Sequence, residues 1–274
     1  MTRIIVAGAN GKVGRLLVPQ LTSAGHEVIA LVRKEVVPAA SRCVIDWMDP
    51  ATRLPDADPA DLVINLTGDV NPPHGDYDSA NVKTAERLRL HYNGSAAHAV
   101  FISFPGASTI SANRYLRTKA EAEASTLGTA RSATILRTVF ICGTPDAPQE
   151  SDLRQQTPKG HPGRCFGDGQ SRYRPLLIDD VVRAIKACID QRLPGAFALE
   201  GKQVLSSEQI IRLLNQEPDK AIRHFPKPLA RMMGPMIGMT RDFVDILVDD
   251  QLCTDPNVFD VCGIVPASVQ QAWS

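Results

Sequence analysis

The feature that most constrains the fold is a strand, a glycine-rich turn, a helix and a second strand within the first 32 residues. Residues 3–7 (RIIVA) form a short apolar run that ends at Gly8, as in a strand buried on both faces. Apolar residues then recur at helical spacing up to Gly25, and residues 28–32 (VIALV) form a second buried run. Because such a crossover connection is right-handed, the two strands are expected to be parallel.

Predicted strands and helices go on alternating along the N-terminal half. Strands are expected at residues 43–45, 62–66, 99–103 and 133–136, and helices at 84–91 and 114–125. The link from Val32 to Cys43 is short and contains Pro38, which leaves little room for a crossover helix. The alternation predicts an α/β fold, a doubly wound parallel sheet of the Rossmann type with helices on both faces.

The glycine-rich turn itself predicts a nucleotide site. In a G-x-x-G-x-x-G turn the first glycine forms the bend, the second lets a phosphate approach the backbone, and the third lets the helix pack closely on the strand. Gly8, Gly11 and Gly14 occupy these three positions. The free N–H groups and the positive end of the following helix favour an anionic pyrophosphate there.

Two basic residues after the second strand bear on the choice of nucleotide. NAD-binding proteins tend to place an acid at this point, whereas this chain has Arg33 and Lys34. Together with Lys12 in the turn, they are expected to pair with a 2'-phosphate, so NADP(H) is favoured over NAD(H). The alternative is a solvated pair of surface cations.

The chain changes in character near residue 145. Residues 143–163 are rich in proline, glycine and polar residues and show no period, which predicts a loop. Helices are then expected at residues 180–189 and 206–214, and a strand at 196–199. We expect a dinucleotide-binding domain at residues 1–145 and a smaller α/β lobe for substrate or partner at 146–274, interleaved with the first.

Composition excludes several classes of function. Thirty basic and thirty acidic side chains give a net charge of zero, which argues against nucleic-acid binding. No apolar run approaches a membrane span, and the chain has no signal-peptide pattern at its start, so a cytoplasmic location is expected. The six cysteines and six histidines are scattered, and no metal site is expected.

Five segments together resemble the extended and atypical short-chain dehydrogenase/reductase superfamily. They are GANGKVG (8–14), VINLTGDV (63–70), NVKTAERL (81–88), YLRTKAEAE (115–123) and TILRTVFICG (134–143). YRPLLIDDVVRAI (173–185) and ILVDDQL (246–252) resemble the branch that contains the nucleotide-binding accessory subunit of respiratory complex I and the NmrA-like NAD(P)-binding proteins.

The resemblance implies a cofactor site that extends over several segments: the glycine turn, the segment beside the adenosine ribose, the start of the next helix, and the segment lining the nicotinamide. With the residues argued above, the expected cofactor-binding residues are Gly8, Asn10, Gly11, Lys12, Val13, Gly14, Arg33, Lys34, Leu66, Thr67, Gly68, Asn81, Lys119, Thr138 and Phe140.

Tyr115 and Lys119 are one helical turn apart, so their side chains point from the same helix face. The resemblance implies that they form the family's Tyr-x-x-x-Lys pair. In that mechanism the ammonium lowers the pKa of the phenol and binds the nicotinamide ribose, while the tyrosine exchanges a proton with the substrate. The alternative is a half-buried tyrosine with a solvated lysine beside it.

Active extended members of the family also carry a serine or threonine just beyond the fifth strand, which hydrogen-bonds the substrate oxygen. In VFISFPGAS (100–108) this position falls near Pro105, which has no hydroxyl. Ser103, at the end of the strand, is the expected replacement, and Ser108 is the alternative. The departure counts against an epimerase or dehydratase of nucleotide sugars.

Two functions follow from these observations. The first is an NADP(H)-dependent oxidoreductase of the short-chain type that acts on a small carbonyl or alcohol substrate through Tyr115, Lys119 and Ser103. The second is a non-catalytic NAD(P)H-binding redox sensor or accessory subunit, in peripheral contact with a membrane complex. Pro105 leaves the choice between them open, and the sequence predicts no oligomeric state.

Two features of the C-terminal lobe have a simple structural interpretation. The methionine-rich segment at residues 228–239 is expected either to line a pocket for an apolar substrate or to pack a methionine face on the sheet domain. Asp242, Asp245, Asp249 and Asp250 recur at spacings of three and four and are expected to form one solvated helix face.

Overall fold

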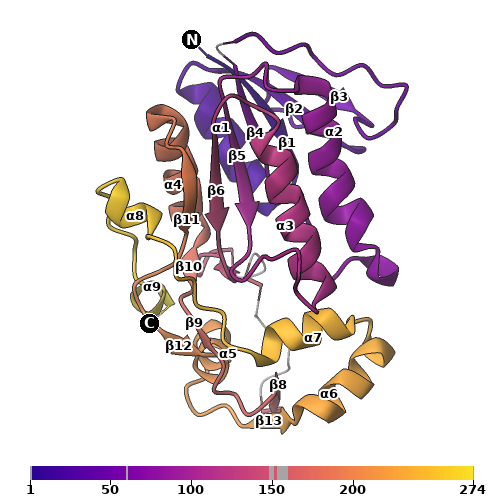
Figure 1. The fold of residues 1–274 in the computed structure, drawn as a ribbon. Coiled ribbons are helices and arrows are strands. Elements are labelled where there is room, and N and C mark those ends of the chain that lie inside the picture. The colour runs from indigo at the N-terminus through magenta and orange to yellow at the C-terminus, as the bar shows by residue number, and fades with distance from the viewer. Residues whose placement is uncertain (1, 60, 148–150, 153–159, 274) are drawn as a thin grey trace.

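A seven-stranded parallel sheet forms the centre of the protein (Figure 1), in the strand order β11-β6-β5-β4-β1-β2-β3. The structure, a computed structural model, describes residues 2–59, 61–147, 151–152 and 160–273. The predicted fold class is confirmed. The strands of this sheet are β1 (Arg3–Ala7), β2 (Glu27–Val32), β3 (Arg42–Ile45), β4 (Leu62–Asn65), β5 (His98–Ser103), β6 (Ala133–Arg137) and β11 (Gly195–Ala198).

The central strand β1 shows why the sheet is covered on both sides. Ile4 and Val6 pack into one apolar cluster, whereas Ile5 and Ala7 pack into another on the opposite face. All four side chains are fully buried. A strand of this kind must be almost wholly apolar, which is the pattern that residues 3–7 show.

Two pairs of helices supply these covers (Figure 1). Helices α1 (Lys12–Ser23) and α4 (Ile178–Gln191) pack against each other on one face, and α2 (Lys83–Tyr92) and α3 (Arg114–Leu127) pack against each other on the other face. The strands β1 and β4 are neighbours in the sheet, but the helix after β1 (α1) lies on one face and the helix after β4 (α2) lies on the other. The carboxyl ends of these two strands lie side by side. Ligands of doubly wound folds bind at such a switch point.

The sheet departs from a simple repeat at two places. Between β2 and β3 no helix is formed, in agreement with the short link at residues 33–41. At the other edge, β11 pairs with β6 in parallel, from Gly195 opposite Thr134 to Ala198 opposite Arg137. Both α4 and β11 follow residue 145 in the chain, so the later segment contributes a helix and a strand to the sheet layer.

Most of the remaining elements lie beyond the carboxyl ends of the strands, at the bottom of Figure 1. They include short two-stranded ladders and small helices. Among the described residues, no helix is long and apolar enough to span a membrane. Their bounds are β7 (Ile141–Cys142), β8 (Gly163–Phe166), β9 (Arg172–Tyr173), β10 (Leu176–Leu177), β12 (Leu205–Ser206), α5 (Ser207–Asn215), β13 (Ile222–Phe225), α6 (Lys227–Met233), α7 (Arg241–Val248), α8 (Val258–Val261) and α9 (Val269–Trp273).

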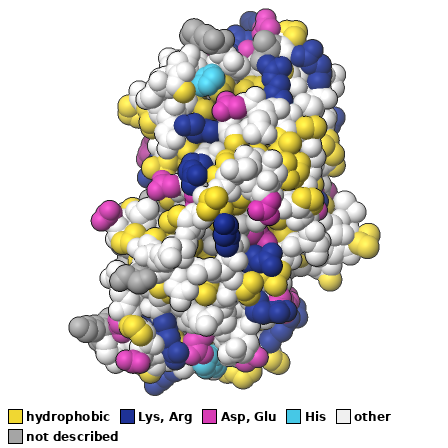
Figure 2. Space-filling model, turned by 90° about the vertical axis from the view of Figure 1, so that its left-hand side faces the viewer, with side chains coloured by type: hydrophobic (Ala, Val, Ile, Leu, Met, Phe, Trp, Pro, Cys, Tyr) yellow, Lys and Arg dark blue, Asp and Glu magenta, His cyan; other side chains and the backbone are white. Residues whose placement is uncertain are grey.

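Charges of both signs are mixed on the face of the molecule that Figure 2 shows. On the face in Figure 2, lysine and arginine side chains are interspersed with aspartate and glutamate. A mixed surface of this kind creates no extended field of one sign, which agrees with the net charge of zero.

The glycine turn joins β1 to α1 with very little space between them. The Gly11 N–H donates to the Gly8 carbonyl at 3.0 Å, which closes the turn. A Cβ at Gly14 would lie 2.5 Å from the Ala9 carbonyl oxygen, which is well inside contact distance. Only glycine at this position lets the first turn of α1 approach the strand, as the motif requires.

Gly14→Ala is therefore expected to lower the free energy of unfolding by about 2 kcal/mol, because backbone must move to accommodate the methyl group. Gly128→Ala is the matched control, since its added Cβ would come close only to the flexible side chain of Arg89, at 3.1 Å, and would lie at an ordinary contact distance of 3.6 Å from the Ser125 carbonyl oxygen. Urea denaturation of both variants measures the difference. Equal stabilities would show that the close packing at Gly14 is not required.

Candidate functional site

A cavity of about 260 Å³ lies at the carboxyl ends of β4, β5 and β6, and we refer to it as the edge cavity. Its walls come from the segments that follow these strands, from α3 and from α7. Among the residues expected from the sequence to form the site, the edge cavity brings together Leu66, Thr67, Gly68, Ser103, Tyr115, Lys119, Thr138 and Phe140.

The glycine turn supplies the second part of the site. Helix α1 begins at Lys12 after Gly11, and no side chain in the described part of the protein caps it. The start of a helix, where N–H groups point outward, is the kind of place that binds an anion. The Val13 side chain packs against the core, so what it offers a ligand is its backbone.

Lys12 lies at this helix start and is bonded across the site. Its Nζ donates to Asp152 at 2.7 Å, and the other carboxylate oxygen of Asp152 accepts from the Ile141 N–H at 2.9 Å. Asp152 also lines the edge cavity. The ion pair thus connects the glycine turn with the segment after β7, and it places a carboxylate at the cavity wall.

Lys119 is buried, with 4% of its surface exposed. Its Nζ donates to the Ile102 carbonyl at 2.7 Å and lies 4.2 Å from the centre of the Phe101 ring. Burial lowers the pKa of Lys119 to about 7, because the charged form loses its hydration; the Glu123 carboxylate opposes this effect. The amine can therefore gain or lose a proton near neutral pH.

Gly68 and Asn81 lie next to Lys119, in the segment after β4 and at the start of the following helix. Asn81 accepts from the Asp69 N–H at 3.2 Å and donates to the Thr118 hydroxyl at 3.3 Å, which connects the segment after β4 to α3. Gly68 has a φ of +142°, and a Cβ there would lie 2.8 Å from Asn81 Oδ1 and 3.2 Å from Lys119 Nζ. The backbone can pass this close to both side chains only at a glycine.

Tyr115 lies in the same cavity, but its pKa is shifted in the opposite direction from the one that the resemblance implies. Its ring packs against Phe104 at a centroid distance of 5.3 Å and against Tyr77 at 6.1 Å. Burial raises the pKa of Tyr115, and the carboxylates of Asp152 and Asp69 raise it further. The expected lowering of the phenol pKa by Lys119 is not what this structure shows, because loss of hydration dominates.

Two hydroxyls in the cavity have no hydrogen-bond partner among the described residues. Ser103 and Thr138 are 2% and 4% exposed, and both side-chain oxygens are buried. They are close neighbours, since the Thr138 N–H donates to the Ser103 carbonyl at 3.1 Å. A buried hydroxyl without a partner is costly, so this pair is suited to a ligand that supplies the missing bonds.

The structure distinguishes between Ser103 and Ser108 as replacements for the missing serine. Ser103 lines the edge cavity, whereas Ser108 is not among its described lining residues. Pro105 is buried and faces a different hollow of about 500 Å³, which lies against α6 and α7. Ser103 is therefore the better placed of the two serines to meet a substrate at Tyr115.

The two basic residues expected at a 2'-phosphate lie directly after β2. Arg33 and Lys34 are both exposed, and neither lines the edge cavity as described. Strand β2 pairs with β1, whose end leads into the glycine turn. The two cations therefore stand at the same sheet edge as the turn, next to the strand that enters it.

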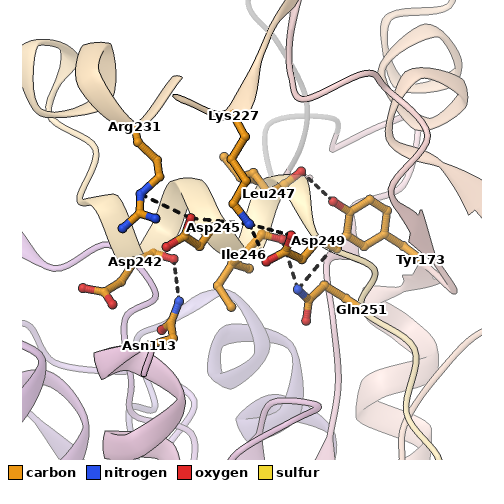
Figure 3. A network of polar contacts seen from close by, with 10 residues as sticks. All are labelled: Asn113, Tyr173, Lys227, Arg231, Asp242, Asp245, Ile246, Leu247, Asp249 and Gln251. Carbon is orange, nitrogen blue, oxygen red and sulfur yellow. Dashed lines mark hydrogen bonds and ion pairs between the residues drawn. The ribbon is translucent and has the colours of Figure 1, made fainter. Parts of the chain in front are cut away.

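Helix α7 docks on the start of α3 (Figure 3). Asn113 caps α3 by accepting from the Leu116 N–H, and its amide donates to the Asp242 carbonyl at 2.9 Å. The Asp242 carboxylate accepts from the Arg114 N–H at 2.8 Å. Negative charge at the start of a helix stabilises it, so α7 fixes the end of the helix that carries Tyr115.

The prediction of one solvated acidic helix face is therefore wrong. Helix α7 ends at Val248, before Asp249 and Asp250. Asp245 lies 3.6 Å from Arg231, Asp249 lies 2.8 Å from Lys227, and Asp250 lies 2.5 Å from Arg172. Each carboxylate pairs with a cation from another element, and these pairs hold α6, α7 and β9 together.

Neither expectation for the methionine-rich segment is confirmed. Met232 and Met236 are 64% and 83% exposed, so they do not form a packed face. Met239 by contrast packs against a buried cluster together with Phe243. No methionine is among the described residues that line the edge cavity.

Two of the cavity residues that the sequence did not predict, Asp152 and Phe243, lie outside every motif segment. Asp152 lies in the loop without periodicity and gains its position from Lys12, 140 residues away. Phe243 is an ordinary apolar residue of an amphipathic helix, and no local pattern distinguishes it from a core residue. Only their position in the folded chain, beside the other cavity residues, identifies these two residues.

The lowered pKa of Lys119 predicts how stability depends on pH. Between pH 7 and the ordinary lysine value of 10.5, the unfolded chain binds a proton that the folded chain does not, so stability rises with pH in this range. Relative to Lys119→Met, the free energy of unfolding should rise by on the order of 1 kcal/mol per pH unit from pH 7 to 9. Lys202→Met, at an exposed position, is the control. Parallel curves for the wild type and Lys119→Met in urea titrations would contradict the assignment.

Comparison with known proteins agrees with this architecture. Residues 4–93 match the NAD dependent epimerase/dehydratase family. The NADH dehydrogenase [ubiquinone] 1 alpha subcomplex subunit 9, mitochondrial, of Arabidopsis thaliana is 28% identical over 271 residues, a match that covers 87% of this chain. The chain spans 63% of the length of that relative.

Solved structures share the fold at low identity. The human epimerase family protein SDR39U1 with NADPH superimposes with a TM-score of 0.73 at 15% identity, covering 99% of this chain and 98% of that one. The UDP-glucuronic acid 4-epimerase of Bacillus cereus in complex with NAD gives a TM-score of 0.66 at 18% identity, covering 82% and 87% of the two chains. The resemblance of this chain to the extended and atypical short-chain dehydrogenase/reductase superfamily, predicted from its motifs, is confirmed.

Proposed function

We propose that the protein is an NADP(H)-dependent oxidoreductase that reduces a small carbonyl compound. The observation that carries this proposal is the edge cavity, in which Tyr115 and Lys119 lie together with the hydroxyls of Ser103 and Thr138, neither of which has a hydrogen-bond partner in the described part of the chain. A proton donor, a titratable amine and free hydrogen-bonding groups in one buried site suit proton transfer to a substrate oxygen. On this proposal, residues 1–145 form the cofactor domain and 146–274 the substrate lobe, interleaved with it.

The residues present fit a nicotinamide dinucleotide. The uncapped start of α1 suits the pyrophosphate, and the close passage of Gly68 beside Lys119 leaves a backbone surface that a ribose can approach. Structural relatives are described with NADPH or with NAD, which supports a cofactor of this class. The reduced nicotinamide, when bound, supplies a hydride to the carbonyl carbon.

The electrostatics of the site favour reduction over oxidation. Because burial and the Asp152 and Asp69 carboxylates raise the pKa of Tyr115, its phenol keeps its proton near neutral pH. Tyr115 is therefore suited to give that proton to the oxygen that becomes an alcohol. The Ser103 hydroxyl donates a hydrogen bond to the same oxygen, and Lys119 binds the ribose and, below its pKa of about 7, carries a proton that can replace the one lost.

A second function is favoured by two specific observations. Pro105 removes the hydroxyl from the position that active extended members use, and a complex I subunit is among the relatives. On this alternative the chain binds NAD(P)H without turnover, as a redox sensor or as an accessory subunit in peripheral contact with a membrane complex. The named relative is mitochondrial, and the expected cytoplasmic location stays a prediction.

Tyr115→Phe should abolish the oxidation of NADPH by aldehydes and ketones, with kcat lowered at least about 100-fold. The affinity for NADPH, measured by fluorescence titration, should be unchanged, since the ring and its packing remain. Tyr92→Phe, a buried tyrosine outside the edge cavity, is the control and should keep full activity. Unchanged turnover in Tyr115→Phe would remove Tyr115 from the mechanism. NADPH binding without turnover in the wild type would favour the alternative function.

Arg33→Ala tests the preference for NADP(H). The substitution removes a cation that pairs with the 2'-phosphate, so the dissociation constant should rise about tenfold for NADPH and change little for NADH. Arg42→Ala is the control, because Arg42 is exposed at the start of β3, away from the carboxyl edge. Equal losses for NADPH and NADH would contradict the assignment of the phosphate to Arg33.

A further inference from the structure

The wall of the edge cavity is mainly apolar and firmly packed. Phe104 is 5% exposed and contacts the Tyr115 ring edge to face. Phe140 is also 5% exposed and packs against the Tyr173 ring at a centroid distance of 5.1 Å. Phe243 of α7 adds a third ring. Rings held in this way form a fixed surface that favours flat or apolar ligands.

Two charged side chains are among the described residues that line this cavity, Lys119 and Asp152. The Lys119 amine is bonded to the Ile102 carbonyl, and its lowered pKa leaves it little positive charge above pH 7. Asp152 is held in place by the Ile141 N–H and by Lys12. An anionic group in the cavity would therefore meet the carboxylate of Asp152, which is exposed and already paired with Lys12, and no free cation from the described lining, so its approach is unfavourable.

The size of the cavity also favours a small ligand. Its volume of about 260 Å³ has to hold the reacting ring of the cofactor as well as the substrate. Pockets for drug-sized ligands generally start at about 300 Å³. A nucleotide sugar would need far more room, and its diphosphate would need cations that the described lining of the edge cavity lacks.

We propose that the edge cavity takes a small, uncharged, aromatic or aliphatic carbonyl compound, and that Asp152 is the residue that discriminates against anionic substrates. The inference rests on the proposed function for the reaction, but it concerns the chemical class of ligand that the cavity binds. It can therefore be tested by binding as well as by turnover.

The test compares two aldehydes of similar shape and different charge. Benzaldehyde and 4-carboxybenzaldehyde are titrated by calorimetry at pH 8 into the full chain, with and without saturating NADP⁺, so that binding is measured where no reduction occurs. Benzaldehyde is expected to bind at least about tenfold more tightly than its carboxylate, a difference typical of one unfavourable charge contact. Turnover of both compounds with NADPH is measured separately.

Asp152→Asn isolates the role of the carboxylate. The variant keeps the size of the side chain and is expected to bring the two affinities within about threefold, mainly by tighter binding of 4-carboxybenzaldehyde. Asp190→Asn, at an exposed position on α4, should leave the wild-type ratio unchanged. Circular dichroism and NADPH affinity of each variant show that the fold and the cofactor site remain intact.

The outcomes separate this inference from the proposed function. Selective binding of benzaldehyde without turnover would retain the substrate class and overturn the oxidoreductase proposal. Equal or tighter binding of the carboxylate, binding of UDP-glucose in preference to both aldehydes, or binding of neither aldehyde would overturn the inference. An unchanged ratio in Asp152→Asn would remove Asp152 as the discriminating residue.

Discussion

The bond from the Lys119 amine to the Ile102 carbonyl is the contact on which the rest of the site depends. It joins α3, which carries Tyr115, to the end of β5, which carries Ser103. A buried amine must have a partner, and the strand carbonyl supplies it at 2.7 Å. This bond, together with the Asn81 bridge from the segment after β4, fixes the distance between the helix and the sheet edge and so creates the cavity between them.

The later part of the chain contacts this site through α7 as well as through the sheet. The Asp242 carboxylate accepts from the Arg114 N–H at the start of α3, while the next residue, Phe243, forms part of the cavity wall. One turn of α7 therefore both stabilises the helix that carries Tyr115 and limits the space in front of it. A change in how α7 docks would alter the orientation of the helix and the size of the cavity together, so the position of Tyr115 and the space beside it depend on the same contact.

The sequence predicted those elements whose pattern lies within one short segment of the chain. Alternating apolar runs and the spacing of Gly8, Gly11 and Gly14 were sufficient for the β1–α1–β2 unit, and the spacing of Tyr115 and Lys119 placed both on one helix face. Contacts between distant segments could not be predicted, since Lys12 pairs with Asp152 across 140 residues. The acidic residues after position 241 were misassigned because their partners lie on other elements, as Asp250 does with Arg172.

Burial also shifts the pKa of Tyr115 and that of Lys119, and the spacing of the two residues in the sequence does not predict these shifts. Removing water penalises the charged form of both groups, so it raises the pKa of the phenol and lowers that of the amine. The phenol then keeps its proton near pH 7, whereas the amine is close to half protonated there. A neutral phenol can donate its proton to a base, and the alkoxide formed when a carbonyl is reduced is such a base. Low hydration therefore makes this pair better suited to donating a proton to a substrate than to removing one.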